Sequence, residues 1–163
     1  MISNEMVERA CTEVGTYTDD QMMKEFDRFF QKQPGICDFV SELTSDSAIE
    51  IQELSLFLSY MVFKAAEAAD PRGLSEVPAD QIESAFHDSE SWIDRIEQAQ
   101  DKGTGLELDD TEPFLMQYVI SELNQPLEDG KLLEDEQKGE VFFVLRTVIS
   151  SFASKPNGKE TKT

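Results

Sequence analysis

Hydrophobic residues recur along this chain at spacings of three and four, the spacing expected of α-helices with one apolar side. Turn residues, prolines and short acidic stretches separate seven segments with this pattern. The predicted helices are residues 4–14, 19–33, 34–44, 49–66, 80–100, 113–124 and 135–154. No segment alternates apolar and polar residues as a half-buried strand does. The pattern therefore predicts an all-α protein, a compact bundle of about seven helices.

Several helix starts have recognisable capping residues. Thr18 followed by Gln21, and Ser47 followed by Glu50, have the spacing of a capping box, in which side chain and backbone satisfy each other's hydrogen bonds. Ser3 or Asn4 is placed to cap the first helix. Three further residues are predicted at or next to a helix start: Pro34, Thr111 and Pro113.

The segment 49–66 differs from the others because it is apolar on nearly every side. Such a helix must be enclosed by other helices or cross a membrane. Its 18 residues are near the lower limit for a membrane span, and it contains Glu50, Glu53 and Lys64. We therefore expect it to be buried in a protein core.

The order of helix types in residues 18–68 recurs weakly in residues 78–154. In each part an amphipathic helix is followed by a helix that begins with proline and then by a strongly apolar helix. This order suggests a duplicated unit of three helices, with the two apolar helices side by side at the centre. The alternative is that any two amphipathic helices share such spacings without being repeats.

Length and charge narrow the choice of partners. A chain of 163 residues is most simply one domain, here residues 1–154, followed by a polar and disordered tail at 155–163. The formal net charge is −20, from 34 acidic and 14 basic residues. This charge repels nucleic-acid phosphates and anionic lipid, so we expect no direct binding to DNA, RNA or membranes. Solubility alone is the simpler explanation of this acidity, and attraction of a basic protein partner is the alternative.

The two cysteines, Cys11 and Cys37, are not spaced as a metal-binding or redox pair. The N-terminal residues lack the basic and apolar regions of a signal peptide. Together these features predict reduced thiols and a cytoplasmic location. Neither cysteine has an evident base beside it in the sequence, so neither is predicted to be a catalytic nucleophile.

One polar pair was considered as a weak candidate site. Glu83 and His87, one helical turn apart, could form an acid–base pair or contribute to a metal site, but an ordinary surface pair explains them more simply. A metal site needs three or four ligands, and the chain has one histidine and no calcium-binding loop pattern. We therefore predict no catalytic residue, no metal and no cofactor.

The chain has more aromatic residues than one helix face can bury, so some must fill the centre of the bundle or form an exposed patch, and filling of the core is the simpler expectation. Four phenylalanines fall off the best inward-facing stripes and could form a surface for a second copy or a partner helix. These candidate interface residues are Phe29, Phe57, Phe63 and Phe142.

Three functions follow as hypotheses. The first is a non-enzymatic protein–protein interaction module, such as an adaptor, regulator or immunity-type protein, with a basic partner or as a homodimer. The second is a nucleic-acid mimic, whose acidic side chains copy phosphates and block a DNA-binding protein. The third is an enzyme or ligand-binding protein with a pocket between the two halves.

Overall fold

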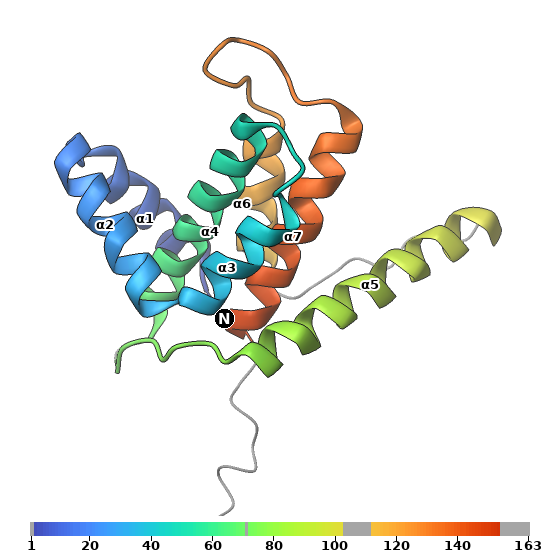
Figure 1. The fold of residues 1–163 in the computed structure, drawn as a ribbon, viewed down its shortest axis with the longest axis horizontal. Coiled ribbons are helices and arrows are strands. Elements are labelled where there is room, and N and C mark those ends of the chain that lie inside the picture. Colours follow the sequence, from blue (N-terminus) through green and yellow to red (C-terminus); the bar gives the residue numbers. More distant parts are fainter. Residues whose placement is uncertain (1, 71, 103–111, 154–163) are drawn as a thin grey trace, which may run out of the picture.

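The computed structural model describes residues 2–70, 72–102 and 112–153 (Figure 1). These ranges contain seven α-helices and no β-strand, so the predicted all-α fold is confirmed. The helices are α1 (Asn4–Gly15), α2 (Asp19–Lys32), α3 (Pro34–Leu43), α4 (Ile49–Ala69), α5 (Ala79–Lys102), α6 (Pro113–Leu123) and α7 (Asp135–Ala153). The predicted cap Thr111 and the predicted tail at 155–163 lie outside the described residues.

Helices α4 and α7 form the centre of the bundle. They pack against each other, and every other described helix contacts one or both of them. Helix α4 buries ten of its residues, including Tyr60 and Phe63, and α7 buries nine. The expectation that 49–66 is enclosed by other helices is therefore confirmed. None of the described helices combines the length and the low charge needed to cross a bilayer.

The duplication of 18–68 in 78–154 stays a prediction. The contact between α4 and α7 agrees with it. That contact does not test the duplication, because the two most apolar helices of any bundle are expected to meet at its centre.

Two of the predicted caps at helix starts are confirmed. Thr18 and Gln21 form the full capping box of α2, with the Gln21 N–H donating to Thr18 Oγ1 (3.2 Å) and the Thr18 N–H donating to Gln21 Oε1 (2.8 Å). Ser3 accepts a hydrogen bond from the Met6 N–H at the start of α1. The predicted prolines, Pro34 and Pro113, occupy the first turns of α3 and α6.

The predicted capping box of α4 is wrong. The residue at the N-cap is Ala48, which has no side chain to accept a hydrogen bond. Ser47 Oγ instead donates to Glu140, which places the serine between α4 and α7. The Ser47 hydroxyl therefore contacts Glu140 of α7 and does not form the hydrogen bond at the start of α4 that the local sequence predicts.

Candidate interaction face on helix α5

Helix α5 lies along the side of the bundle, where it contacts α7 and α3 (Figure 1). Ile82 and Ala85 are buried in this contact. The position of Gly35 on α3 contributes, because a Cβ atom there would lie only 3.1 Å from the Ile82 side chain. The C-terminal half of α5 extends away from the other helices, and its outer side is open to solvent.

Polar contacts fix α5 on α7 at three points. Near its start, Gln81 donates to the Ser151 carbonyl oxygen (2.6 Å). In the middle, the fully buried Ser89 accepts hydrogen bonds from Arg146 Nη1 (3.0 Å) and Thr147 Oγ1 (2.9 Å). Arg146 also contacts Asp88 Oδ2 (3.1 Å), and its guanidinium lies 4.8 Å from the centre of the Trp92 ring. These contacts hold one side of the helix inward and so determine which side faces solvent.

The solvent side of α5 carries a regular row of acidic side chains. Asp80, Glu83, Glu90, Asp94 and Glu97 are all exposed, and together with His87 they follow one another at spacings of three and four residues. Residues at these spacings lie on the same side of a helix. With a rise of 1.5 Å per residue, the row extends for roughly 26 Å. We call these six residues the α5 acidic row.

Only Asp80, in the first turn of α5, and Glu90, beside His87, are placed to stabilise their own helix. Like charges three or four residues apart destabilise a helix by roughly 0.2–0.5 kcal/mol per pair. Asp80, Glu83, Asp94 and Glu97 have no ion pair with another described residue, and Arg95 is not paired with them. A helix selected only for stability would alternate these carboxylates with lysines. The charge pattern of α5 therefore differs from the one that helix stability alone favours.

Sequence reasoning singled out two members of this row but missed the row. The predicted pair Glu83 and His87 does not form the contact that was considered: His87 Nδ1 lies 3.0 Å from Glu90 Oε1, and its ring packs edge-on against Phe86. The three- and four-residue spacing of the acids was present in the sequence. The periodicity of apolar residues, which predicts the buried side of a helix, does not reveal this acidic spacing on its exposed side.

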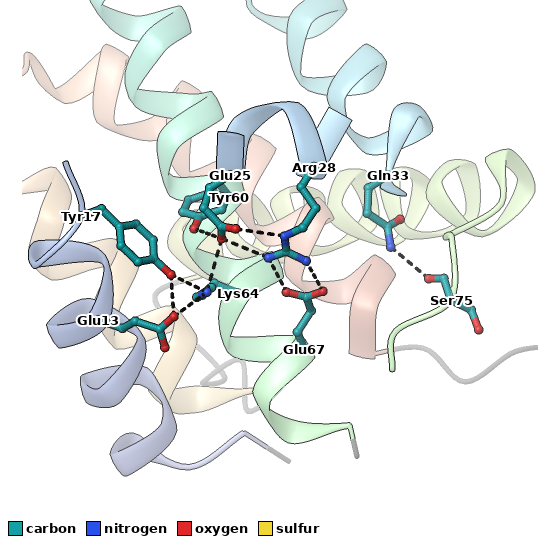
Figure 2. A network of polar contacts seen from close by, with 9 residues as sticks. All are labelled: Glu13, Tyr17, Glu25, Arg28, Gln33, Tyr60, Lys64, Glu67 and Ser75. Carbon is teal, nitrogen blue, oxygen red and sulfur yellow. Dashed lines mark hydrogen bonds and ion pairs between the residues drawn. The ribbon is translucent and has the colours of Figure 1, made fainter. Parts of the chain in front are cut away.

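The basic residues nearest the core are already neutralised within the chain, as Figure 2 shows for α1, α2 and α4. Arg28 makes a two-pronged contact with Glu67 (2.6 and 2.8 Å) and another with Glu25 (3.0 and 3.0 Å). Lys64 contacts Glu25 (3.3 Å) and Glu13 (2.8 Å). These cations are therefore occupied by Glu13, Glu25 and Glu67 and do not offset the other acids of the bundle.

This network stabilises its charged forms. The Arg28 guanidinium, together with a hydrogen bond from the Tyr60 hydroxyl (2.6 Å), lowers the pKa of Glu25 to about 2. Hydrogen bonds to Glu67 and Glu25 raise the pKa of Arg28. Burial and the bond to Glu25 raise the pKa of Tyr60, so the phenol stays protonated. With every member paired, the network is suited to joining helices and leaves no free base or nucleophile among its members.

Hydrogen bonds of Gln33 also fix the segment from which α5 begins. Gln33, fully buried between α2 and α3, donates from Nε2 to the Ser75 carbonyl (2.9 Å), as Figure 2 shows. Its Oε1 accepts from the Val77 N–H (2.9 Å). Both contacts are with the segment that leads into α5. The orientation of the acidic row is therefore determined at the start of α5 as well as along its buried side.

The four candidate interface phenylalanines divide into two pairs. Phe29 and Phe63 are fully buried and lie 5.0 Å apart between ring centres, so the expectation that they fall off the inward stripes is wrong. Phe57 is half-buried against the core. Phe142 is also half-buried, and its ring centre lies 5.6 Å from that of Trp92. An interface role for Phe57 and Phe142 stays a prediction.

Other large apolar side chains are exposed at positions that the sequence did not single out. Phe30, next to the buried Phe29 on α2, is 43 % exposed. Among the described residues, the exposed large apolar side chains are Met23, Phe30, Leu43, Ile49, Ile120 and Leu132. They are distributed over five helices or loops, with only Met23 and Phe30 on the same helix.

Neither cysteine has the properties of a catalytic nucleophile. Both are free; Cys37 is buried in α3, and burial raises the pKa of its thiol to about 12. Burial also raises the pKa of Cys11. Within the described ranges, no three or more His, Cys, Asp or Glu side chains are gathered as metal ligands. Comparison of the chain with protein families, with curated proteins and with solved structures gives no match.

Proposed function

We propose that this protein is a non-enzymatic interaction module whose α5 acidic row binds a basic surface of another protein. The observation that carries the proposal is the row itself: five exposed carboxylates at helical spacing, on a helix whose other side is fixed to the bundle. The net charge of −20 adds a long-range attraction for a basic partner. Free cysteines support a reducing compartment such as the cytoplasm.

The direct test compares two variants with the same net charge. The row variant replaces four acids of α5 with their amides: Glu83→Gln, Glu90→Gln, Asp94→Asn and Glu97→Gln. The control variant replaces four exposed acids on other elements: Glu42→Gln, Glu50→Gln, Glu76→Gln and Glu128→Gln. Because the row variant removes repulsions within α5 and a single exposed contact, that of Glu90 with His87, we expect both proteins to keep their helical content.

The first measurement uses a defined probe, a helical peptide of about 20 residues with lysines along one side. We expect the wild type and the control variant to bind it with similar affinity at low salt. The row variant should bind about tenfold more weakly, a loss of about 1.4 kcal/mol. Equal losses in the two variants would show that net charge alone attracts the peptide and would contradict a specific role for α5.

The second measurement identifies the natural partner. The three proteins are immobilised and exposed to a cell lysate, and the bound proteins are identified by mass spectrometry after elution with salt. A partner retained by the wild type and the control variant but lost from the row variant supports the proposal. If no protein shows this pattern at any salt concentration, the proposal is wrong.

Nucleic-acid mimicry is the second candidate function, and the regular spacing of the row favours it. Carboxylates along one side of a helix can occupy a groove that otherwise holds DNA phosphates. If this is the function, duplex DNA will displace the protein from its partner in direct competition. A partner that binds this protein and DNA simultaneously would exclude mimicry and leave the interaction module.

A further inference from the structure

Helices α1 and α6 line a surface groove of about 510 Å³ that is open to solvent and is formed by residues distant in sequence from the α5 acidic row. A small molecule bound in this groove would be covered on one side only. One α1 stripe and one α6 stripe line it, each at spacings of three and four residues. The groove is therefore a product of helix packing and extends along both helices.

The lining is apolar in its interior and polar at its rim. Val7 is buried, and Cys11, Phe114 and Tyr118 are half-buried, so their side chains form the floor. Exposed polar side chains stand at the edges. Glu8 is the single charged residue of the described lining, and Asn4 Nδ2 holds its carboxylate with a hydrogen bond of 3.0 Å.

The floor is electrically neutral and the nearby charges are negative. Burial raises the pKa of both the Cys11 thiol and the Tyr118 hydroxyl, and the two groups share a hydrogen bond. Glu8 and Glu122 raise the pKa of Cys11 further. An anionic ligand would therefore meet the Glu8 carboxylate and no cation in the described lining, with Glu122 adding a second negative charge nearby. A ligand with an apolar body and a positive charge would be complementary to both the floor and the rim.

We propose that the α1–α6 groove binds a small organic cation with an aromatic body, of the arylalkylamine class. Its ring packs on the floor beside Phe114 and Tyr118, where aromatic contacts are favourable. Its ammonium group faces Glu8 at the rim. The proposal concerns a different surface from the α5 acidic row and does not depend on it.

The test uses the reactivity of Cys11 in the full-length protein. Cys11 is partly exposed in the groove while Cys37 is buried, so N-ethylmaleimide should modify Cys11 first, and intact mass spectrometry can follow the rate. We expect phenethylammonium at about 1–10 mM to slow this modification at least about threefold, as a ligand that occupies the groove excludes the reagent. Phenylacetate, which has the same ring and the opposite charge, should give no protection.

Two variants locate the effect. Glu8→Gln should reduce the protection by phenethylammonium about threefold or more, whereas Glu42→Gln, which removes the same charge from α3, should leave it unchanged. Gln117→Trp, at an exposed position of α6, fills the groove and should abolish the protection without unfolding the protein. Equal protection by the cation and the anion, or no protection by phenethylammonium at 10 mM, would overturn the proposal.

Discussion

Glu25 is the carboxyl group on which the network between α1, α2 and α4 converges, since Arg28, Tyr60 and Lys64 all contact it. Its pKa is about 2 in the folded protein and near 4.5 when unperturbed. A carboxyl with a lowered folded pKa contributes stability that is complete above about pH 4.5 and is lost as the pH falls toward 2. Glu25→Gln should therefore cost about 1–2 kcal/mol at pH 7 and much less at pH 2.5.

Urea denaturation of Glu25→Gln at both pH values measures this difference. The matched control is Glu42→Gln, which removes an exposed carboxylate that has no ion pair among the described residues. If the two variants lose the same stability at pH 7, the network does not contribute as its geometry indicates.

Ser59 and Ser89 form a natural comparison, because both are fully buried serines in helices. The Ser59 hydroxyl has no hydrogen-bond partner in the described part of the chain, whereas Ser89 accepts from Arg146 and Thr147. An unpaired buried hydroxyl costs about 1–3 kcal/mol, and alanine is the better helix former. Ser59→Ala should raise the free energy of unfolding by about 1 kcal/mol, while Ser89→Ala should lower it by about 1–3 kcal/mol. Chemical denaturation of the two variants gives the signs, and a similar loss in both would contradict the assignment.

For single residues, the sequence predicts which chemical group is present but not whether that group is buried or exposed. Phe29 and Phe30 are adjacent and identical in type, yet Phe29 is fully buried and Phe30 is 43 % exposed. The difference arises from α4, whose Tyr60 and Phe63 receive the Phe29 ring at 6.0 and 5.0 Å between ring centres. A pattern within α2 contains no information on where those two rings lie.

At the level of the helices, the start of α4 is open to improvement. Its N-cap residue has the extended backbone that a capping residue needs but no side chain that could accept a hydrogen bond. Ala48 has φ −57° and ψ 152° and is exposed, so a serine there could accept a hydrogen bond from the first turn. Ala48→Ser should stabilise the protein by about 1 kcal/mol. Thermal and urea denaturation would show the gain. Ala48→Val, which cannot cap the helix, is the control, and an equal gain from valine would contradict the capping explanation.

The helices themselves were predictable because their signals are local. Thr18 with Gln21 and the prolines at the starts of α3 and α6 act within one turn, and all were placed correctly. Ser47 was placed wrongly because its hydroxyl contacts Glu140, which is 93 residues away. The same limit applies to the acidic row on α5. Its spacing is local, but its exposure depends on which side of α5 Arg146 and Thr147 hold against α7.

For the whole molecule, a net charge of −20 means that folding brings many carboxylates together. Mutual repulsion destabilises such a compact state, and salt screens it. Raising NaCl from 10 to 300 mM at pH 7 should therefore raise the Tm by about 3 °C or more. The same addition near pH 4.2, the isoelectric point, should have little effect, because the net charge is then close to zero. Calorimetry or circular dichroism at both pH values tests this, and an equal response would exclude repulsion as its cause.

The all-α class and the central place of α4 and α7 followed from apolar content, which is a property of each segment. The α1–α6 groove could not be anticipated in that way. Its two walls come from Asn4–Gly15 and Pro113–Leu123, and nothing in either segment indicates that it will lie beside the other.

The N–H of Ile2, a buried residue, donates to Glu112 Oε1 (2.7 Å), and α1 packs on α6 as well as on α4. Glu112 is held with a positive φ of 46°, a conformation that is costly for a residue with a side chain. During synthesis, α1 can pack on α4 early, but it finds Glu112 and α6 only after a further 110 residues have been added. The contact between α1 and α6 is therefore among the last to form. A chain that ends at residue 102 should leave α1 more sensitive to proteolysis than the full chain does, because α1 then keeps α4 but lacks α6.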